Sequence, residues 1–563
     1  MKQLIECVPN FSEGRDLAVI KQITDAIESV EGVKLLDVDP GKATNRTVVT
    51  FVGEPGPVTE AAFRAIRTAC SVIDMSKHSG EHPRMGATDV CPLIPVSNIS
   101  MQETAEWARR LGERVGRELE LPVYLYEAAA SRPERRNLAA VRAGEYEALP
   151  EKLSKPEWKP DFGPAAFNAK SGATVIGARD FLVAYNINLN TTSTRRANSV
   201  AFDVREIGRV LHDPATGKPL KDAAGEPLRQ PGILKGVKAI GWYIEEYGIA
   251  QISMNITDVN ATPLHQAFEA CTKSAESRGM RVTGSELVGL VPLNVLLDAG
   301  RYFLKKQQRS AGVSEEELIK IAVKTMGLGE LAPFDPQRKI IEYQLAQDDP
   351  AAAKKLIRKD LRAFADEAAS ESPAPGGGSV SAYVGALGIS LATMVANLSA
   401  HKRGWDERWE TFSAAAERGQ LIKDALLRAV DEDTDAFNAI MEAFGLPKGT
   451  PEEKTARSAA IQHATLGAIE VPLRVLRLAL DSFPLIRQMV ESGNPNSITD
   501  AGVGALCARA AAFGAALNVK VNATGLHDKA YAANVVAEVD TAMAEAARLE
   551  TEILNLVREK MGV

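Results

Sequence analysis

The fold is decided at Leu328-Gly-Glu-Leu-Ala-Pro333-Phe-Asp-Pro336-Gln-Arg-Lys-Ile-Ile-Glu-Tyr-Gln-Leu-Ala-Gln-Asp-Asp-Pro350, because the sequence changes character across this segment. Before it, short β-rich runs alternate with amphipathic stretches. After it, Ala, Leu, Glu, Lys and Arg recur at helical spacing with almost no strand signal. Its prolines indicate a linker over residues 329–350, in which residues 339–345 have the pattern of a strand that docks back on the first half. The sequence therefore predicts an α+β half followed by an all-α half.

The first half divides into two segments of similar texture, residues 1–178 and 179–328. We expect each to be a ferredoxin-like sheet-plus-helix subdomain with its helices on one face of the sheet. Residues 211–230, rich in Pro, Gly, Lys and Asp, indicate a surface excursion or hairpin. The expected strands are 4–8, 34–38, 46–53, 90–96, 121–126, 180–189, two within 237–256, and 280–290; the expected helices are 17–29, 58–73, 100–118, 194–208 and 263–278.

The second half, residues 351–563, is expected to be an all-helical domain of long antiparallel helices. An apolar stretch at residues 380–398 is interrupted by Gly, Ser and Asn, so it is interpreted as a buried helix and not as a membrane span. The helices expected here are 351–371, 380–399, 407–442, 451–481, 483–491, 498–518 and 529–560.

Charge and cysteine content narrow the classes of function. A formal net charge of −7 argues against a nucleic-acid binder, which would have a basic face. The beginning of the sequence has no signal-peptide pattern, and the five cysteines are scattered singly, as is typical of a reducing compartment. We therefore expect a cytoplasmic protein that binds small molecules, with no nucleic-acid or membrane partner.

A polar loop between a helix and an apolar strand contains two of the seven histidines, His78 and His82. Histidine titrates near neutral pH, so a proton-transfer role fits a loop held by a rigid scaffold. A zinc site is the less favoured alternative, because Gly80 and Pro83 oppose a helix, the order is not HExxH, and no third ligand stands nearby. A purely structural, hydrogen-bonded loop remains a further alternative.

Several long strings in the first half resemble formiminotransferase domains. They include Glu6-Cys-Val-Pro-Asn-Phe-Ser-Glu-Gly14, Thr44-Asn-Arg-Thr47, His78-Ser-Gly-Glu-His82-Pro-Arg-Met-Gly86 and Arg142-Ala-Gly-Glu-Tyr-Glu-Ala-Leu-Pro150. The resemblance implies transfer of a formimino group from N-formimidoyl-glutamate to N5 of tetrahydrofolate, with release of glutamate. It also implies that tetrahydrofolate, as a polyglutamate, is a co-substrate and that no tightly bound cofactor or metal is needed.

The resemblance places the catalytic histidine of that family on His82. One imidazole there would accept the proton lost from N5 and supply one to the departing glutamate nitrogen.

Arg46, Arg84 and Asp39 are further candidates for substrate binding, with structural ion pairs as the alternative. The length of the 211–230 excursion departs from the family pattern and weakens the match at Ile233. The folate contacts implied by the resemblance are Gly163, Pro164, Ala165, Ala166, Phe167, Asn168, Ala169, Lys170, Ser171, Gly172, Gly232, Ile233 and Leu234.

A glycine run, Ser372-Pro-Ala-Pro-Gly-Gly-Gly-Ser379, precedes the first long helix of the second half. Exposed NH groups at such a helix start hold anions or carbonyl oxygens, although a flexible hinge is the plain alternative. The run resembles the entry to formiminotetrahydrofolate cyclodeaminase domains, as does the acidic string at residues 429–437. That resemblance places the catalytic aspartate on Asp433, for closing 5-formimino-tetrahydrofolate to 5,10-methenyl-tetrahydrofolate with loss of ammonia. On pattern alone, a solvated acidic stripe is the alternative, and Asn518 and Asn522 are weak candidates to bind the pterin.

Two competing functions remain. The imidazole would serve a formyl donor as well as a formimino donor, and the helical half, with its small residues, would also serve as an assembly module. The resemblance implies a homo-oligomer, a ring-like assembly of dimers. Lys402 and Arg403 are candidate anchors for a polyglutamate tail that passes between two sites.

Overall fold

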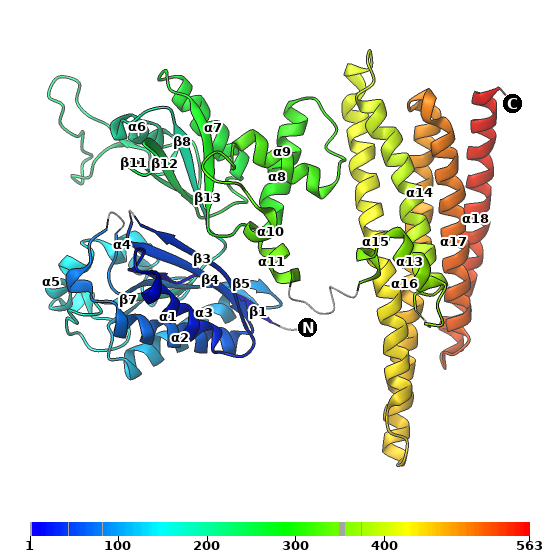
Figure 1. Ribbon diagram of the computed structural model, residues 1–563, viewed down its shortest axis with the longest axis horizontal. Coiled ribbons are helices and arrows are strands. Elements are labelled where there is room, and N and C mark those ends of the chain that lie inside the picture. The colour runs from blue at the N-terminus through cyan, green and yellow to red at the C-terminus, as the bar shows by residue number, and fades with distance from the viewer. Residues whose placement is uncertain (1–2, 43, 81–82, 348–354, 373, 563) are drawn as a thin grey trace. The chain divides into compact units, whose positions relative to one another are not determined.

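The computed structural model describes residues 3–42, 44–80, 83–347, 355–372 and 374–562. The chain forms two compact units (Figure 1). The first contains residues 1–299 and 323–345, and the second contains residues 300–322 and 346–563. Every strand that the structure describes lies in the first unit, whereas the long helices after residue 376 lie in the second. The prediction of a mixed sheet-and-helix half followed by a helical half is confirmed.

The first sheet has seven strands in the order β1-β4-β2-β5-β7-β6, with β3 paired to β4. Only β7 makes parallel pairs, with β5 and β6; the other pairs are antiparallel. Three amphipathic helices pack on it through buried side chains such as Ile23, Ile27 and Ile66 (Figure 1). The elements are β1 Leu4–Cys7, β2 Asn10–Phe11, α1 Leu17–Glu28, β3 Val33–Gly41, β4 Arg46–Gly53, α2 Pro55–Val72, η1 Met75–Lys77, β5 Thr88–Ser97, α3 Met101–Glu118, β6 Val123–Glu127, η2 Pro133–Arg135, α4 Leu138–Arg142, η3 Tyr146–Ala148, α5 Leu149–Leu153, η4 Pro156–Trp158 and β7 Thr174–Ala178.

The second sheet has four antiparallel strands in the order β11-β12-β8-β13. Along β8, Tyr185, Ile187 and Leu189 are buried in the core, and the alternate residues Asn186 and Asn188 lie on the opposite face. That opposite face is polar. The elements are β8 Val183–Leu189, α6 Thr194–Val204, β11 Val237–Ile244, β12 Ile249–Ile256, α7 Leu264–Glu276 and β13 Val282–Val288, followed by α8 Leu293–Lys306 and α9 Glu315–Met326.

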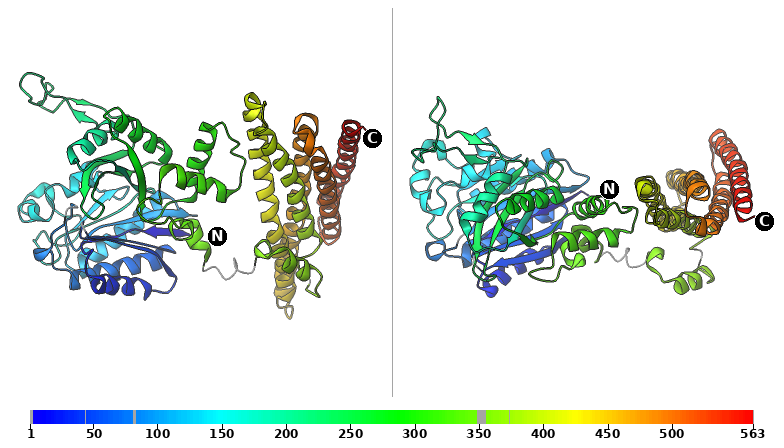
Figure 2. Two further views of the ribbon diagram at one scale, coloured as in Figure 1. Left: turned by 45° about the horizontal axis from the view of Figure 1, so that its top comes forward. Right: turned by 90° about the horizontal axis from the view of Figure 1, so that it is seen from above.

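The excursion predicted at residues 211–230 is confirmed as a hairpin-like arm. Its base is the two-stranded pair of β9 Arg209–Val210 with β10 Arg229–Gln230. Isolated bridges join His212 to Pro219 and Lys221 to Pro227 farther out. The arm projects from the end of the second sheet beyond α6 (Figures 1 and 2).

The strand predicted at residues 339–345 is wrong, because this stretch forms two short helices, α10 Pro336–Lys339 and α11 Ile341–Gln347. Asp335 caps the first helix by accepting a hydrogen bond from the NH of Gln337, and Pro336 occupies the first turn, where no NH is needed. Its apolar residues do dock on the first unit, as expected. Ile340 and Ile341 are buried, and the backbone of Val291 bonds to both sides of Ile340.

The second unit is built on long helices: α14 Gly377–Ala400, α15 Trp409–Gly445, α16 Pro451–Ser492, α17 Ile498–Ala523 and α18 Lys529–Met561. The two helices expected at 451–481 and 483–491 are one helix, α16, which continues through Pro472 and Pro484. Around both prolines the helix is packed into the core by side chains buried between Thr465 and Val490, and this burial outweighs the backbone bonds lost at the prolines. The helix expected at 351–371 is also wrong in its described part, which holds η5 Leu356–Arg358 and α13 Leu361–Ala368, begun by Asp360. The remaining short helices are η6 Asp406–Arg408 and η7 Pro495–Ser497.

Two helical stretches, Gly377–Ala400 and Pro495–Ala523, are long and apolar enough to cross a membrane by length and composition. Half or more of the apolar part of each is buried inside the helical unit. That is the burial expected of core helices.

The loop between α8 and α9 belongs to the second unit and is packed into it. The NH groups of Ser310 and Ala311 donate to His401 Nε2 at 3.1 Å and to Ser413 Oγ at 3.0 Å. The carbonyl of Gly312 accepts from the side-chain amides of Asn397 and Gln420. Residues 310–312 are buried, so this loop is part of the helical core.

Candidate functional site

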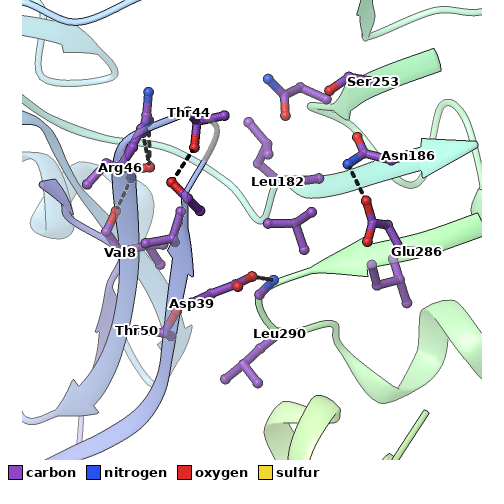
Figure 3. Close-up of a pocket in the computed structure, with 18 of the residues that line it drawn as sticks. Val8, Asp39, Thr44, Arg46, Thr50, Leu182, Asn186, Ser253, Glu286 and Leu290 are labelled. Atoms are coloured by element: carbon purple, nitrogen blue, oxygen red, sulfur yellow. Dashed lines mark hydrogen bonds between the residues drawn. The ribbon is translucent and has the colours of Figure 1, made fainter. Parts of the chain in front are cut away.

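A cavity of about 580 Å³ lies in the first unit between the two sheets (Figure 3). One wall is formed by strands of the first sheet and the other by the polar face of the second sheet. The two walls differ in chemistry. The first wall carries Glu6, Asp39, Arg46, Arg142 and Arg179, and the second carries Asn186, Trp242, Gln251, Ser253, Asn255 and Glu286.

The first wall is cationic around Asp89, which is fully buried. Its Oδ2 accepts from Arg46 at 3.2 Å and from Arg142 at 2.7 Å, so two guanidinium groups share one carboxylate. Burial lowers the pKa of Arg46 to about 10, which still leaves it protonated at neutral pH. This wall therefore favours an anionic ligand group.

Glu6 is an ionisable group on this wall that sequence reasoning did not select. It is 3% exposed, and burial raises the pKa of its carboxyl to about 7, opposed by the charge of Arg179. The strand alternation of β1, apolar apart from Glu6, carried the only sequence signal for it.

On the second wall, a hydrogen-bonded row of amides and carboxylates runs across three strands. Gln251 Nε2 donates to Asn188 Oδ1 at 2.8 Å and to Glu286 Oε1 at 3.0 Å, and Asn186 Nδ2 donates to Glu286 Oε1 at 3.0 Å. These residues were also missed. Polar residues at every second position, as at Gln251, Ser253 and Asn255 in β12, were the available signal.

Asp39, a candidate from the sequence, lines the cavity and joins its two walls. Its Oδ2 accepts from the backbone NH of Gly289 at 3.2 Å (Figure 3). Asp39 comes from β3 of the first sheet, and Gly289 follows β13 of the second.

His82 and the preceding Glu81 lie outside the described residues, but the chain is described up to Gly80 and again from Pro83. His78 Nε2 donates to the carbonyl of Asn45 at 2.8 Å, and His78 Nδ1 accepts from Arg84 Nε at 3.3 Å. Gly80 lies so close to Thr44 that a Cβ there would be 2.3 Å from the Thr44 carbonyl oxygen. Thr44 lines the cavity, so the segment that precedes His82 packs beside its first wall.

Arg84 and His78 have structural partners. Arg84 forms ion pairs with Glu145 at 3.1 Å and Glu147 at 2.7 Å, and it is 8% exposed. Both ring nitrogens of His78 are engaged in the bonds described above. Among the described residues, no group of three His, Cys, Asp or Glu is placed to hold a metal ion.

The segment Gly163 to Gly172 lies along a separate, open hollow and against the loop that contains His82. Gly163, Pro164, Ala166, Phe167, Asn168 and Ala169 line that hollow together with Glu113, Arg117 and Glu120. At its other end, Gly172 pairs with Gly86, and the carbonyl of Lys170 accepts from the NH of Met75. Gly172 has a φ of +69° and no room for a Cβ.

The segment Gly232 to Leu234 lies in the second subdomain at the base of the arm. Its NH groups bond to the carbonyls of Glu206, Asp203 and Val204, and Ile233 is 66% exposed. None of these three residues, and none of residues 163–172, lines the cavity between the sheets.

In the helical unit, Asp433 belongs to α15, and its side chain lies beside the N-terminus of α14, where the glycine run ends. Ser379 Oγ donates to Asp433 Oδ2 at 3.0 Å, and the backbone NH of Ser379 also donates to this carboxylate. Gly378 packs directly on it, since a Cβ there would lie 2.2 Å from Asp433 Oδ1. Burial raises the pKa of Asp433, and the hydrogen bonds from Ser379 oppose that shift. The glycine run thus holds an anion of the chain itself.

The neighbouring acidic residues point elsewhere, as helical geometry requires. Asp431 Oδ1 accepts from the NH of Leu356 at 2.6 Å, and Asp435 is exposed. Asn518 lies beside Gly377, whose added Cβ would be 3.5 Å from Asn518 Nδ2, whereas Asn522 donates to the carbonyl of Ala468.

The two candidate tail anchors, Lys402 and Arg403, follow the end of α14. The ammonium of Lys402 lies over the ring of Trp405 at 4.2 Å. For Arg403, the structure describes no ion pair or hydrogen bond of its side chain, and the residue is exposed.

Comparison with known proteins matches family models along the chain. The N-terminal subdomain of the formiminotransferase domain matches residues 4–179, the formiminotransferase domain matches residues 184–346, and formiminotransferase-cyclodeaminase matches residues 360–541. Formimidoyltransferase-cyclodeaminase from Mus musculus is 45% identical over 94% of this chain and 94% of its own length. The chain belongs to the formimidoyltransferase-cyclodeaminase family.

Two shorter relatives each match one half. Glutamate formimidoyltransferase from Streptococcus pyogenes serotype M1 is 41% identical over 54% of this chain and 94% of its own length. Methenyltetrahydrofolate cyclohydrolase from Methylorubrum extorquens is 40% identical over 36% of this chain and 97% of its own length. Each of these two relatives therefore corresponds over almost its whole length to only a part of this chain.

Proposed function

We infer that this chain is a bifunctional enzyme with both activities of its family. It transfers the formimidoyl group of N-formimidoyl-L-glutamate to N5 of tetrahydrofolate, releasing glutamate, and it cyclises 5-formimidoyl-tetrahydrofolate to 5,10-methenyl-tetrahydrofolate, releasing ammonia. The match to bifunctional relatives along nearly the whole chain carries this conclusion. A formyl donor with a helical half used only for assembly is not favoured, because both halves match enzymes.

The activities are assigned to the chain as follows. Residues 1–178 and 179–328 are the two transferase subdomains, each of ferredoxin-like type, residues 329–350 are the linker, and residues 351–563 are the cyclodeaminase. The end of the first matched family model at residue 179 supports the boundary between the subdomains, and the start of the third at residue 360 supports a separate helical domain, whereas the second model extends to residue 346, within the proposed linker.

The transferase reaction is assigned to the cavity between the sheets, with His82 as the acid and base. N5 attacks the formimidoyl carbon and loses a proton, and the glutamate nitrogen gains a proton as it leaves; one imidazole performs both transfers. The packing of His78 and Gly80 against Asn45 and Thr44 brings the described part of this loop to the first wall of the cavity, which supports the assignment of the reaction there. The arginine wall is complementary to the carboxylates of both substrates.

Folate contacts remain assigned to Gly163–Gly172 and to Gly232–Leu234. The contact of the first segment with the loop around Gly86 supports that part of the assignment. The exposure of most residues of the first segment, and of Ile233 in the second, suits the p-aminobenzoyl and polyglutamate end of the folate, which extends out of a cavity.

The cyclodeaminase reaction is assigned to Asp433. N10 attacks the formimidoyl carbon and loses a proton, and the departing ammonia requires one. A carboxyl whose pKa is raised by burial exchanges protons closer to neutral pH than an exposed one does. Tetrahydrofolate is a co-substrate in both reactions, with no tightly bound cofactor and no metal.

The protein is further proposed to be a cytoplasmic homo-oligomer, a ring-like assembly of dimers, without nucleic-acid or membrane partners. All five cysteines are free thiols, which suits a reducing compartment. Large apolar side chains are exposed along the outer faces of α14 and α17, which suits burial against a second copy: Val380, Leu387, Met394, Leu398, Val503, Leu506, Leu517 and Val521. Light scattering on the purified protein tests this proposal, and a monomer contradicts it.

The decisive experiment is a crossed pair of variants. His82→Ala is expected to lower transferase turnover by roughly 10²–10⁴-fold and leave ammonia release from 5-formimidoyl-tetrahydrofolate unchanged. Asp433→Asn is expected to do the reverse. Each variant's remaining activity reports that it is folded. If either variant loses both activities or neither, the assignment of separate sites is wrong.

A further inference from the structure

Glu286 lies on β13, on the second wall of the cavity, with its side chain half-buried. The carboxylate of Glu286 accepts two hydrogen bonds in the described structure, and both are accepted by the same oxygen, Oε1. Asn186 Nδ2 and Gln251 Nε2 each donate to Oε1 at 3.0 Å (Figure 3 shows the first). The other oxygen, Oε2, has no donor among the described residues.

The carboxylate is held in one orientation by the bonds behind it. Trp242 Nε1, which can only donate, gives its hydrogen to Gln251 Oε1 at 3.1 Å. The amide nitrogen of Gln251 must therefore face Glu286 and Asn188, as observed. Because these donors occupy Oε1, the acceptor capacity that remains is that of Oε2.

Within the described part of the chain, no Lys, Arg or His forms an ion pair with Glu286. The buried carboxylate of the opposite wall, Asp89, has two arginine partners. A carboxylate turned to a cavity with one oxygen satisfied and no counter-charge is suited to accept hydrogen bonds from a ligand.

We propose that Glu286 binds the pterin ring of tetrahydrofolate by its pyrimidine edge. The N3–H and the 2-amino group of that ring point the same way, and Oε2 accepts from both, one on each of its two lone pairs. The cavity volume is within the range of ligand sites, and Trp242 supplies an aromatic side chain beside this edge. This inference rests on the proposed transferase function and names the residue that selects its folate substrate.

The formimidoyl group offers a similar pair of donors, but the geometry favours the pterin. His78 and Gly80 pack against Asn45 and Thr44, of which Thr44 lines the first wall, and Glu286 lies across the cavity on the second (Figure 3). N5 belongs to the reduced ring of the pterin, away from the pyrimidine edge. A folate that presents N5 toward the first wall therefore directs its 2-amino group toward the second.

Glu286→Gln tests the proposal because it keeps the shape and exchanges an acceptor for a donor. The KM for tetrahydrofolate in the transferase reaction is expected to rise at least tenfold. The KM for N-formimidoyl-glutamate is expected to change less than twofold, and cyclodeaminase turnover of the same preparation is expected to stay at the wild-type value. A rise in the KM for N-formimidoyl-glutamate alone would assign Glu286 to the other substrate and overturn the proposal.

A folate analogue without the 2-amino group separates contact from distortion. Wild-type protein is expected to bind 2-desamino-tetrahydrofolate at least tenfold more weakly than tetrahydrofolate, and Glu286→Gln is expected to bind both within threefold of each other. Equal binding of the two folates by the wild type would sink the proposal.

Glu330→Gln is the matched control. Glu330 accepts from Asn188 in the same hydrogen-bonded row but does not line the cavity. Its KM for tetrahydrofolate is expected to stay within threefold of the wild-type value, and a tenfold rise would show that the row acts only structurally. Wild-type protein without any transferase turnover would instead contradict the proposed function itself.

Discussion

At the scale of single residues, the two candidate sites share a buried carboxyl group. Each contains a carboxyl group whose pKa is raised by burial. These groups are Glu6 in the cavity and Asp433 of α15 beside the start of α14. The hydrogen bonds from Ser379 partly offset the burial of Asp433, and the charge of Arg179 does the same for Glu6. The stability of the fold therefore depends on pH through both groups.

Glu6→Gln is expected to stabilise the first unit at pH 8 and to change little at pH 4. The folded-state pKa of about 7 lies above the ordinary 4.5, so the contribution of Glu6 to stability is full below pH 4.5 and is lost as pH rises through 7. At about 1.4 kcal/mol per pKa unit, the gain is on the order of 3 kcal/mol. Calorimetric unfolding at both pH values measures it. Glu28→Gln, on the exposed side of α1, is the control, and equal midpoints for the wild type and Glu6→Gln at pH 8 would refute the prediction.

Gly378→Ala is expected to lower cyclodeaminase turnover at least tenfold without affecting the transferase. A Cβ would lie 2.2 Å from Asp433 Oδ1, so the carboxylate must leave its bonds with Ser379. Gly377→Ala is the matched control, because its Cβ would meet only Asn518 Nδ2 at 3.5 Å, an ordinary contact. Ammonia release assays on both variants decide the matter, and equal activities would contradict a role for this packing.

At the scale of elements, the arm between β9 and β10 was predicted from its turn-forming composition. This prediction succeeded because the arm is detached from the core. Residues 212–227 are mostly exposed, and their described backbone bonds join one side of the arm to the other. Such a segment folds by local rules, which sequence reveals well.

Replacing residues 211–228 by Asn-Gly is expected to leave the transferase intact. Val210 and Arg229 are already paired, and a two-residue turn closes such a hairpin. The unfolding free energy should change by less than about 1 kcal/mol, because lengthening or shortening a loop costs little. Transferase KM values and a urea titration check this. A rise in the KM for tetrahydrofolate would contradict the prediction and show that the arm itself contributes to folate binding.

The stretch at residues 339–345 shows the opposite case. Its apolar residues are compatible with a strand or a helix over so short a length. Helix capping by Asp335 and the docking of Ile340 beside Val291 decided for helices. Similarly, the break expected at residue 482 does not occur, because the buried part of α16 keeps the helix continuous through Pro472 and Pro484.

At the scale of the whole molecule, the helical unit includes residues 300–322, which precede its long helices in the chain by more than fifty residues. A fragment of residues 346–563 is therefore expected to fold with a lower midpoint than the same unit in the full chain. It lacks the bonds of Ser310, Ala311 and Gly312 to the bundle, each contributing roughly 1 kcal/mol. Thermal unfolding followed by circular dichroism compares the two. A fragment as stable as the full-length unit would show that the loop adds nothing.

Sequence by itself determined the two fold classes, most element positions and, through long motif matches, the family. Each of these depends on local composition, periodicity or contiguous strings, which can be recognised in the sequence without knowledge of the fold. Only the tertiary structure brought Glu6, Arg142, Gln251 and Glu286 to one cavity, because they come from three strands and a helix that lie far apart in the chain. It alone also placed Asp433 against Ser379, since the orientation of one aspartate among three on a helix depends on what packs beside it.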